Sequence, residues 1–440
     1  MGTCSPIQRS HRLIAEQSTE KRVVAMGSSS LRVGKQRERS FWWFILMSSL
    51  TYVAVDINVQ GVMALLPFIR DEFALSSSSL GLYSSFLFLS STLMAIIGGQ
   101  FVDMLGSRRG MVGGILSVSI FAMCHAWVPS YSYILALVLL SGFGFSLVTP
   151  SVNRAVIDWS PASSRGLAMG ISQSGGCVGA VLGAALLPQL AVGMGWRGAV
   201  VVGGLLGIVT SLFLWFFYRE RGTAPHTRRA FDFSAVKRLV KNRRLLFVCL
   251  LGIGFGSVNS SLLTHLAVFL NQDLGLDKTV AGLGLSALYL GGITGRLGWG
   301  WVGDRLLKGS SRRMLFIICM INVLMAGLFA GFTENVVLPT ALVLFLVFLW
   351  GTTAVGWITS FFTAIGQLVD QESTGTATGL SLIFVRAGVV VSPPLLGYLA
   401  DVHGSYELSW VFLGGLVLIL ACCFYWLTAP YERASYKEGA

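Results

Sequence analysis

"GQFVDMLGSRRG", residues 99–110, places one aspartate and two arginines between two long apolar runs. A similar cluster, "GWVGDRLLKGSSRR" at residues 300–313, lies between apolar runs in the second part of the chain. Asp103 and Asp304 hold corresponding places in the two clusters. Self-similarity at a fixed spacing is the signature of an internal repeat. We therefore expect one structural unit to occur twice.

The composition indicates a membrane protein. Of the 440 residues, 54% are hydrophobic and 12% are charged, and the mean hydropathy is +0.71. Soluble domains carry about 25% charged residues, and an apolar run of about 20 residues spans a bilayer as a helix. We therefore predict an all-α integral membrane protein with twelve transmembrane helices, at about residues 42–67, 80–101, 110–128, 133–157, 166–189, 197–217, 245–270, 280–301, 314–332, 337–361, 376–399 and 408–428.

A second echo supports the duplication. "GLAMG", residues 166–170, opens the fifth apolar run, and "GTATG", residues 375–379, opens the eleventh. Small residues at these positions are expected to leave a narrow face for close helix approach. Two echoes in the same order predict two pseudo-symmetric halves of six helices each.

The distribution of Lys and Arg predicts the topology. Residues 1–40 hold eight of them and residues 219–244 hold nine, whereas the loops on the opposite side hold only Arg70, Arg197 and Lys278. Basic residues are retained on the cytoplasmic side of a membrane. We therefore expect a multi-pass protein of the cytoplasmic membrane with both termini in the cytoplasm.

The predicted organisation has five parts. The net charge of +12 could indicate a nucleic-acid partner, but its distribution favours retention against anionic lipid. No nucleic acid is expected as a partner, and we expect a monomer. The parts are a disordered basic arm at 1–40, a six-helix half at 41–217, a basic cytoplasmic linker at 218–244, a second half at 245–428 and a cytoplasmic tail at 429–440.

The charged loops resemble a known signature. The pattern G-x-x-x-D-x-x-G-x-R-R, formed by Gly99, Asp103, Gly106, Arg108 and Arg109, is similar to the cytoplasmic loop signature of the major facilitator superfamily. "GWVGDR", residues 300–305, resembles its counterpart in the second half. The resemblance covers the chain from about residue 41 and implies the major facilitator fold.

The resemblance also implies a conformational latch. Asp103 could accept hydrogen bonds from a neighbouring helix N-terminus and pair with Arg108 and Arg109. Asp304 and Arg305 would act in the same way in the second half. The alternative is that these charges only fix the topology.

Arg386 lies near the middle of the run at 376–399. A central arginine costs about 2.5–3.5 kcal/mol on insertion scales, so its presence there needs a reason. Binding of a substrate is one reason, and pairing with a carboxylate is the other.

Arg296 lies nearer the cytoplasmic end of the run at 280–301, so its charge could also simply extend to the membrane interface. "GRLGWGWVGD", residues 295–304, resembles the helix-8 segment of oxalate/formate antiporters and monocarboxylate transporters. In the oxalate/formate antiporters, cationic residues on helices 8 and 11 engage the carboxylate substrate. The resemblance therefore implies that Arg296 and Arg386 bind the substrate.

Asp56 lies within the first run, close to Asn58 and Gln60. This segment resembles the first helix of anion:cation symporters, although Ile57 stands where that family usually has an arginine. Asp56 could carry the coupling proton, neutralise Arg154 or Arg386, or cap a polar cluster without a role in transport. Arg154 is expected to form a structural or gating ion pair.

The seventh run carries a polar group that includes Asn259 and His265. Most of this group can share one helix face. Both residues are candidate substrate-binding residues, and a neutral, hydrogen-bonded histidine is the alternative for His265.

These observations predict a secondary active transporter. We expect it to move a small organic anion, in particular a carboxylate, by alternating access in symport with protons. The alternatives are efflux or antiport of another small molecule and a non-transporting membrane sensor. The sequence contains no pattern typical of an enzyme, a cofactor site or a metal site.

Overall fold

The structure is a computed structural model that describes residues 41–161, 164–220, 239–307, 310–332, 338–370 and 373–438. Every regular element in these ranges is helical. The basic arm at 1–40 and most of the linker lie outside them. The first helix, Phe41–Ala64, ends at a turn and is followed by the short helix α2, Leu66–Phe73. Pro67 lies in the first turn of α2 and has no amide hydrogen, which suits a helix start.

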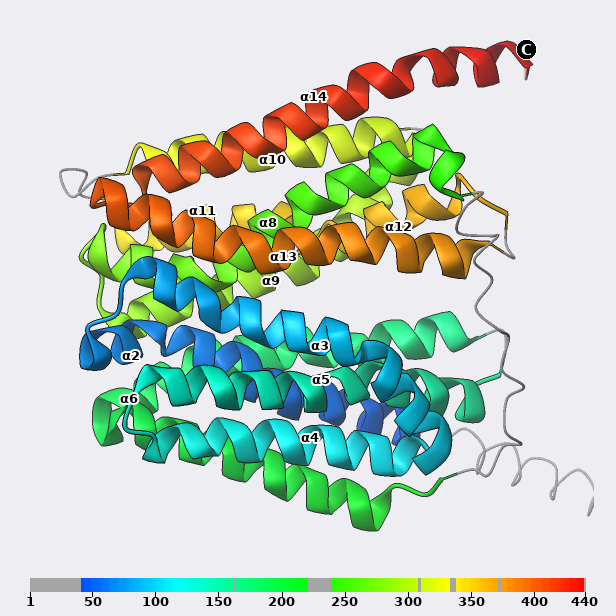
Figure 1. Cartoon of the computed structure of the whole chain (residues 1–440). Helices are drawn as coiled ribbons and strands as arrows, with labels where there is room; N and C mark the ends of the chain where they lie inside the picture. The colour runs from blue at the N-terminus through cyan, green and yellow to red at the C-terminus, as the bar shows by residue number, and fades with distance from the viewer. Residues whose placement is uncertain are drawn as a thin grey trace, which may run out of the picture.

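The remaining elements follow in chain order and form two groups of roughly parallel rods (Figure 1). They are α3 (Ser77–Leu105), α4 (Ser107–Cys124), η1 (His125–Trp127), α5 (Tyr131–Trp159), α6 (Arg165–Phe217), α8 (Arg243–Gln272), α9 (Lys278–Arg305), α10 (Ser311–Ala330), α11 (Thr340–Ala354), α12 (Ile358–Gly366), α13 (Thr374–His403) and α14 (Glu407–Glu438).

These helices supply twelve membrane spans. Ten described helices are long and apolar enough to cross a bilayer, and α3, which is bent by 57°, makes an eleventh. Helix α6 has 53 residues and would be about 80 Å long if straight. It instead turns at Gly195, whose φ of 76° favours glycine. A Cβ built on Gly203 would lie 3.7 Å from Leu187, so α6 folds back on itself as two spans. The predicted fold class is confirmed.

Each half contains a seam where two helix backbones come very close. In the first half, Gly179 of α6 lies against the backbone of Val53. In the second half, Gly388 of α13 lies against the backbone of Ile253 in α8. Gly179 and Gly388 are 209 positions apart, which is also the offset between "GLAMG" and "GTATG". The duplication is thus visible in the packing as well as in the sequence.

The glycines first expected to make these contacts do not make them. A Cβ built on Gly166, Gly170, Gly375 or Gly379 would meet nothing within 4 Å. The expectation of close approach at these four positions was wrong, because the seam residues Gly179 and Gly388 lie 9 to 13 residues farther along the same helices. The offset between the halves was read correctly, and only the residues that pack were misplaced.

Polar contacts join the two halves at the end of the molecule that carries α2, here called the α2 end. On the interface between α3 and α13, the hydroxyl of Ser85 donates to the carbonyl of Val390 at 2.5 Å. On the interface between α6 and α9, the hydroxyl of Ser286 donates to the carbonyl of Val181 at 3.0 Å. Figure 1 shows α3 and α13 side by side near this end and diverging toward the other.

Candidate functional site

Asp56 lies where the first helix meets α6. Its carboxylate accepts a hydrogen bond from Gln60 Nε2 at 3.5 Å, one helical turn away. A Cβ built on Gly176 would lie 2.7 Å from Asp56 Oδ2, so the absence of a side chain at Gly176 leaves room for the carboxylate. The sequence analysis singled out Asp56 but missed Gly176. The only signal available was the glycine-rich composition of this part of α6.

One stripe of α9 faces α6 across the boundary between the halves. Gly282 contacts Ala184 and Pro188, and Ser286 follows one turn later with its bond to Val181. Tyr289 and Arg296 continue the stripe at helical spacing, since they lie seven and fourteen residues after Gly282. The two side chains therefore face the first half.

Asp56 and Arg296 come from opposite halves and interact electrostatically. Tyr289 also interacts electrostatically with Asp56, Arg296 and Cys177. No ion pair within 4.0 Å joins Asp56 to an arginine among the described residues. The carboxylate and the guanidinium cation thus lie on opposite halves, within electrostatic range of each other but more than 4.0 Å apart. We call Asp56, Gln60, Gly176, Tyr289 and Arg296 the central polar cluster.

Three atoms of the central polar cluster are buried without a hydrogen-bond partner among the described atoms. They are Gln60 Oε1, Tyr289 Oη and Arg296 Nε. Tyr289 is only 5% exposed and Gln60 is 8% exposed. A buried polar group without a partner costs about 1–3 kcal/mol, and native proteins contain few of them. These atoms therefore mark a place where a ligand could supply the missing partners.

Arg386 lies on the other interface between the halves, that of α3 and α13. Its guanidinium carbon is 5.4 Å from the ring centroid of Phe88. Arg386 is half-buried, and no described carboxylate lies within 4.0 Å of it. It is one helical turn beyond Val390, on the side away from the α2 end. The alternative that Arg386 serves only to neutralise a contacting acid has no support among the described residues.

The two candidates on α8 differ in their surroundings. Asn259 is half-buried and donates through Nδ2 to the carbonyl of Ala354 at 3.1 Å. His265 is fully buried, and both ring nitrogens have partners: Tyr406 Oη at 3.1 Å and the carbonyl of Pro393 at 2.8 Å. The carbonyl requires a hydrogen on Nε2, so Nδ1 accepts from the tyrosine. The structure does not bring His265 into the central polar cluster.

In the first half, Arg154 holds the end of α3 against α5. Its Nη1 donates to the carbonyls of Val102 and Asp103 at 2.9 and 3.1 Å and lies 3.9 Å from Asp103 Oδ1. Arg154 Nε is also 4.0 Å from Asp158 Oδ2. Arg154 therefore lies within ion-pair distance of Asp103, and a gating or structural role for this pair stays a prediction. Its partner is the aspartate of the loop signature, whose side chain is 67% exposed.

In the part of the chain that the structure describes, Arg108 and Arg109 of the cytoplasmic loop signature do not pair with Asp103 as expected. Arg108 donates to the carbonyl of Trp215, and its guanidinium carbon lies 4.5 Å from the Trp215 ring centroid. Arg109 is exposed. Neither forms an ion pair with Asp103 among the described residues, so the expected pairing of these side chains is replaced by the pair with Arg154.

Gly106 and Glu220 meet at the N-terminus of α4. Gly106 has φ +88°, and a Cβ there would overlap the carboxylate of Glu220. A carboxylate at a helix N-terminus is stabilised by the free amides and the helix dipole. The sequence analysis assigned this role to Asp103. It missed Glu220 because the residue lies far away in the sequence, near the start of the linker.

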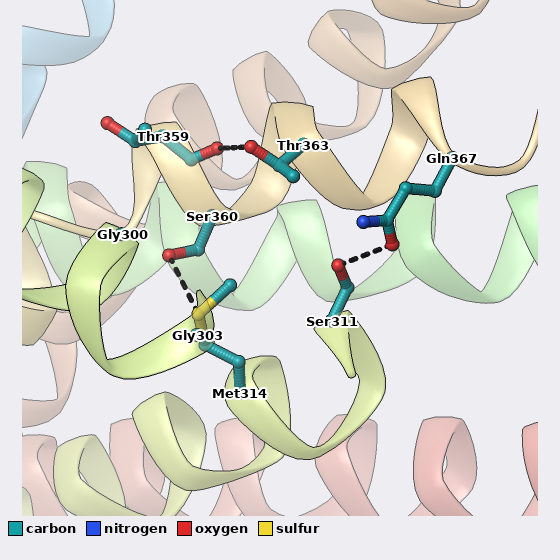
Figure 2. A pocket seen from close by; sticks show the side chains of 8 residues that line it. All are labelled: Gly300, Gly303, Ser311, Met314, Thr359, Ser360, Thr363 and Gln367. Carbon is teal, nitrogen blue, oxygen red and sulfur yellow. Dashed lines mark hydrogen bonds between the residues drawn. The ribbon is translucent and has the colours of Figure 1, made fainter. Parts of the chain in front are cut away.

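The second half is built differently at the corresponding place. A small cleft of about 140 Å³ lies between the end of α9, the start of α10 and α12, where the hydroxyl of Ser311 donates to Gln367 Oε1 at 2.7 Å (Figure 2). Its lining residues are Gly300, Gly303, Ser311, Met314, Thr359, Ser360, Thr363 and Gln367. None of them is charged. Arg305 is exposed, and the Asp304 side chain lies outside the described part of the chain.

Asp401 closes the α2 end. Its carboxylate accepts from the backbone amides of Ser77 and Ser78 at 2.6 and 2.8 Å and from the Ser78 hydroxyl at 2.6 Å. These amides are the free N-terminus of α3, so an acid of the second half caps a helix of the first. Lys278 also pairs with Asp71 across the halves. The sequence analysis did not single out Asp401, because its partners are 323 and 324 residues away.

A second acid at this end lies within the first half. Glu72 accepts hydrogen bonds from Arg197 and from Trp196 Nε1. Burial alone would raise the pKa of Glu72, but these hydrogen bonds and the charge of Arg197 outweigh it and lower that pKa below its usual 4.5. The contact fixes α2 to the turn between the two spans of α6.

Comparison with known proteins agrees with this architecture. The sequence model of the Major Facilitator Superfamily matches residues 48–386 and 266–440. A bacterial homologue of the human lysosomal transporter Spinster, solved in an inward-facing and unoccupied conformation, superimposes with a TM-score of 0.74 and 19% identity, covering 89% of this chain and 97% of that one. A nucleoside transporter superimposes with a TM-score of 0.69 and 14% identity over 87% and 98% of the two chains.

Several curated relatives cover most of this chain at low identity. The hexuronate transporter of Bacillus subtilis is 23% identical over 376 residues, covering 80% of this chain and 86% of the relative. The D-galactonate transporter of Escherichia coli is 25% identical over 419 residues, with 88% and 96% covered. A probable sulfoacetate transporter of Cupriavidus necator is 26% identical over 406 residues, with 87% and 93% covered. The chain belongs to the major facilitator superfamily.

Proposed function

We propose that this protein is a secondary active transporter that moves a small organic anion across the cytoplasmic membrane by alternating access. The observation that carries the proposal is the pair Asp56 and Arg296, which face each other from opposite halves without contact. A site shared between two halves can be opened first to one side and then to the other. The relatives named for hexuronate, D-galactonate and sulfoacetate all carry anions in their names.

The two interior arginines support an anionic substrate. Arg296 and Arg386 lie on the two different interfaces between the halves, and neither contacts a described carboxylate. A guanidinium presents a planar fork of donors that matches a carboxylate or sulfonate. Two such charges would repel a cation, which argues against export of cationic compounds.

Asp56 supports coupling to protons. When a carboxylate binds at Arg296, it competes with Asp56 for the same positive charge. Two carboxylates near one arginine disfavour each other's ionised form. Substrate binding therefore favours protonation of Asp56. The neutralised cluster can then pass through the rearrangement more easily than a charged one. This coupling corresponds to symport of the anion with a proton.

The contacts at the α2 end support a conformation that is closed to the outside, one of the states of the alternating-access cycle. The distribution of basic residues predicts that the α2 end lies outside the cell. A protein whose halves meet there by Asp401, Ser85 and Ser286 is closed to the outside. Rocking of the halves would break these contacts and open the central polar cluster to the external solution.

Uptake into proteoliposomes tests the proposal. Labelled D-galactonate, D-glucuronate and sulfoacetate are offered with an acidic exterior and then without a pH gradient. We expect concentrative uptake of at least one of them only with the gradient, and its loss in Arg296→Ala. Arg313→Ala, which changes an exposed arginine at the start of α10, is the matched control. Binding without any flux would instead favour the membrane-sensor alternative, and exchange unaffected by the gradient would favour antiport.

A further inference from the structure

We propose that Tyr289 and Gln60 determine specificity by binding a hydroxyl group of the transported anion, so that the site selects hydroxylated acids over hydroxyl-free ones. This inference rests on the proposed function and assigns roles to two residues of the same site. It follows from which atoms of the central polar cluster lack partners.

The atoms without partners differ in chemistry. Arg296 Nε is a donor and requires an acceptor, which a carboxylate oxygen provides. Gln60 Oε1 is an acceptor and requires a donor, because its amide nitrogen already serves Asp56. Tyr289 Oη can act as either. A carboxylate alone has only acceptors, so it satisfies Arg296 and leaves Gln60 Oε1 without a partner.

A hydroxyl group supplies what is missing. It both donates and accepts, so a single hydroxyl can donate to Gln60 Oε1 and accept from Tyr289 Oη. Tyr289 and Arg296 lie on one stripe of α9, while Asp56 and Gln60 lie on one face of the first helix. An acid with hydroxyls beside its carboxylate therefore meets donors on one half and acceptors on the other.

The burial of these groups makes the selection strong. Tyr289 and Gln60 are both more than nine-tenths buried, so water does not freely replace a missing ligand group. A site built to hydrogen-bond a substrate hydroxyl rejects analogues that lack it, because its own polar groups are then left without partners. Each lost hydrogen bond corresponds to about a tenfold change in affinity.

Two six-carbon monoacids test this inference. D-galactonate and hexanoate differ in their hydroxyl groups and share one carboxylate, and their binding to the purified full-length protein is measured by titration calorimetry. We expect the wild type to bind D-galactonate at least tenfold more tightly. Tyr289→Phe removes one hydroxyl and should reduce that preference about tenfold, with the affinity for hexanoate unchanged. Arg296→Ala should weaken the binding of both acids.

Two further variants separate specificity from folding. Tyr131→Phe removes another buried hydroxyl, which donates to the carbonyl of Ser79 within the first half, and should leave the preference unchanged. Gln60→Leu removes the acceptor and should reduce the preference as Tyr289→Phe does. Because Gln60 is on a different helix, it tests the same idea if Tyr289→Phe unfolds.

The possible failures are distinguishable. Equal binding of both acids by the wild type, or equal weakening of both by Tyr289→Phe, would overturn the role of these residues and leave the proposed anion transport intact. If the wild type binds none of D-galactonate, hexanoate, D-glucuronate, galactarate and sulfoacetate, both the inference and the proposed function are wrong.

Discussion

Asp401 and Ser78 are joined twice across the boundary between the halves: Asp401 Oδ2 accepts from the Ser78 amide at 2.8 Å and from its hydroxyl at 2.6 Å. The side chain of Ser76 caps the same helix end from within the first half by accepting from the Ser79 amide at 3.2 Å. The N-terminus of α3 is thus shared between a permanent cap of its own half and a removable cap of the other. This is what a reversible closure requires.

Loss of the removable cap should open the α2 end. In Asp401→Asn the charge that faces the α3 N-terminus is gone, and the equilibrium should shift about tenfold away from the closed state. Labelling of Ser84→Cys by an impermeant maleimide measures this shift in a background without other cysteines, because Ser84 is buried against Thr264 of the other half. Glu407→Gln, which changes an exposed acid at the start of α14, should label at the unaltered rate. Unchanged labelling in Asp401→Asn would exclude a closing role.

Asp56→Asn should separate transport from its coupling. The asparagine keeps the size of the side chain and cannot take up a proton. We expect exchange of labelled for unlabelled substrate to continue while uptake driven by a pH gradient is lost. The two assays on the same proteoliposomes check this outcome, and loss of both would assign Asp56 to substrate binding or to folding instead.

A methyl group at Gly176 should impair the site without unfolding the protein. The Cβ would lie 2.7 Å from Asp56 Oδ2, so the carboxylate must move. We expect Gly176→Ala to lower the rate of uptake about tenfold or more, since misplacement of a functional group by about 1 Å has such effects. Gly170→Ala lies on the same helix with open space around it and should behave as the wild type. Equal uptake by the two variants would contradict the proposed position of Asp56.

Gly106→Ala should destabilise the protein for two separable reasons. The backbone conformation of Gly106, φ 88° and ψ 167°, costs a residue with a side chain about 1–3 kcal/mol, and the Cβ also overlaps Glu220. In the background of Glu220→Ala the second cost disappears, so the same substitution should then cost less. Thermal unfolding of the four proteins in detergent gives the coupling. Additive effects would show that Gly106 and Glu220 do not meet.

The contact between Glu72 and Arg197 should stabilise the protein at neutral pH and not in acid. The pKa of Glu72 is lowered in the folded state, so its contribution is fully present above 4.5 and is lost as the pH falls through the folded-state value. Since the Glu72 side chain is 37% exposed, we expect less than about 1 kcal/mol. The difference in stability between the wild type and Glu72→Gln should shrink as melts are repeated from pH 7 to pH 4. A constant difference would exclude the titration of Glu72 as its cause.

The arrangement of the helices could be predicted from the sequence because lipid leaves the backbone few choices. Long apolar runs must be helices there, and the charged loops around Asp103 and Asp304 showed that they repeat. The partners of the side chains could not be predicted in the same way. The pairs Gly106 with Glu220 and Asp103 with Arg154 depend on how far one helix is shifted and rotated against the next, and hydropathy contains no information on that.

Only some residues of the central polar cluster could be predicted from the sequence, for the same reason. Asp56 and Arg296 attract notice because charges inside a membrane are expensive. Tyr289 and Gly176 are ordinary residues of a membrane helix until their neighbours are known. The repeat offset of 209 relates Cys177, next to Gly176, to Arg386, but it does not identify Gly176 as a neighbour of Asp56. This offset places Cys177 and Arg386 at matching depth in their halves.

The seams at Gly179 and Gly388 have a consequence for the motion itself. With no space for even a methyl group between the paired backbones, the helices of a seam cannot slide or roll, and each block of helices must turn as a stiff lever. A displacement caused by the bound substrate is then not absorbed by movement between the helices of one half, and it is transmitted along the whole length of that half. Gly179 and Gly388 thereby determine how closely movement at the ends of the helices follows substrate binding in the middle of the membrane.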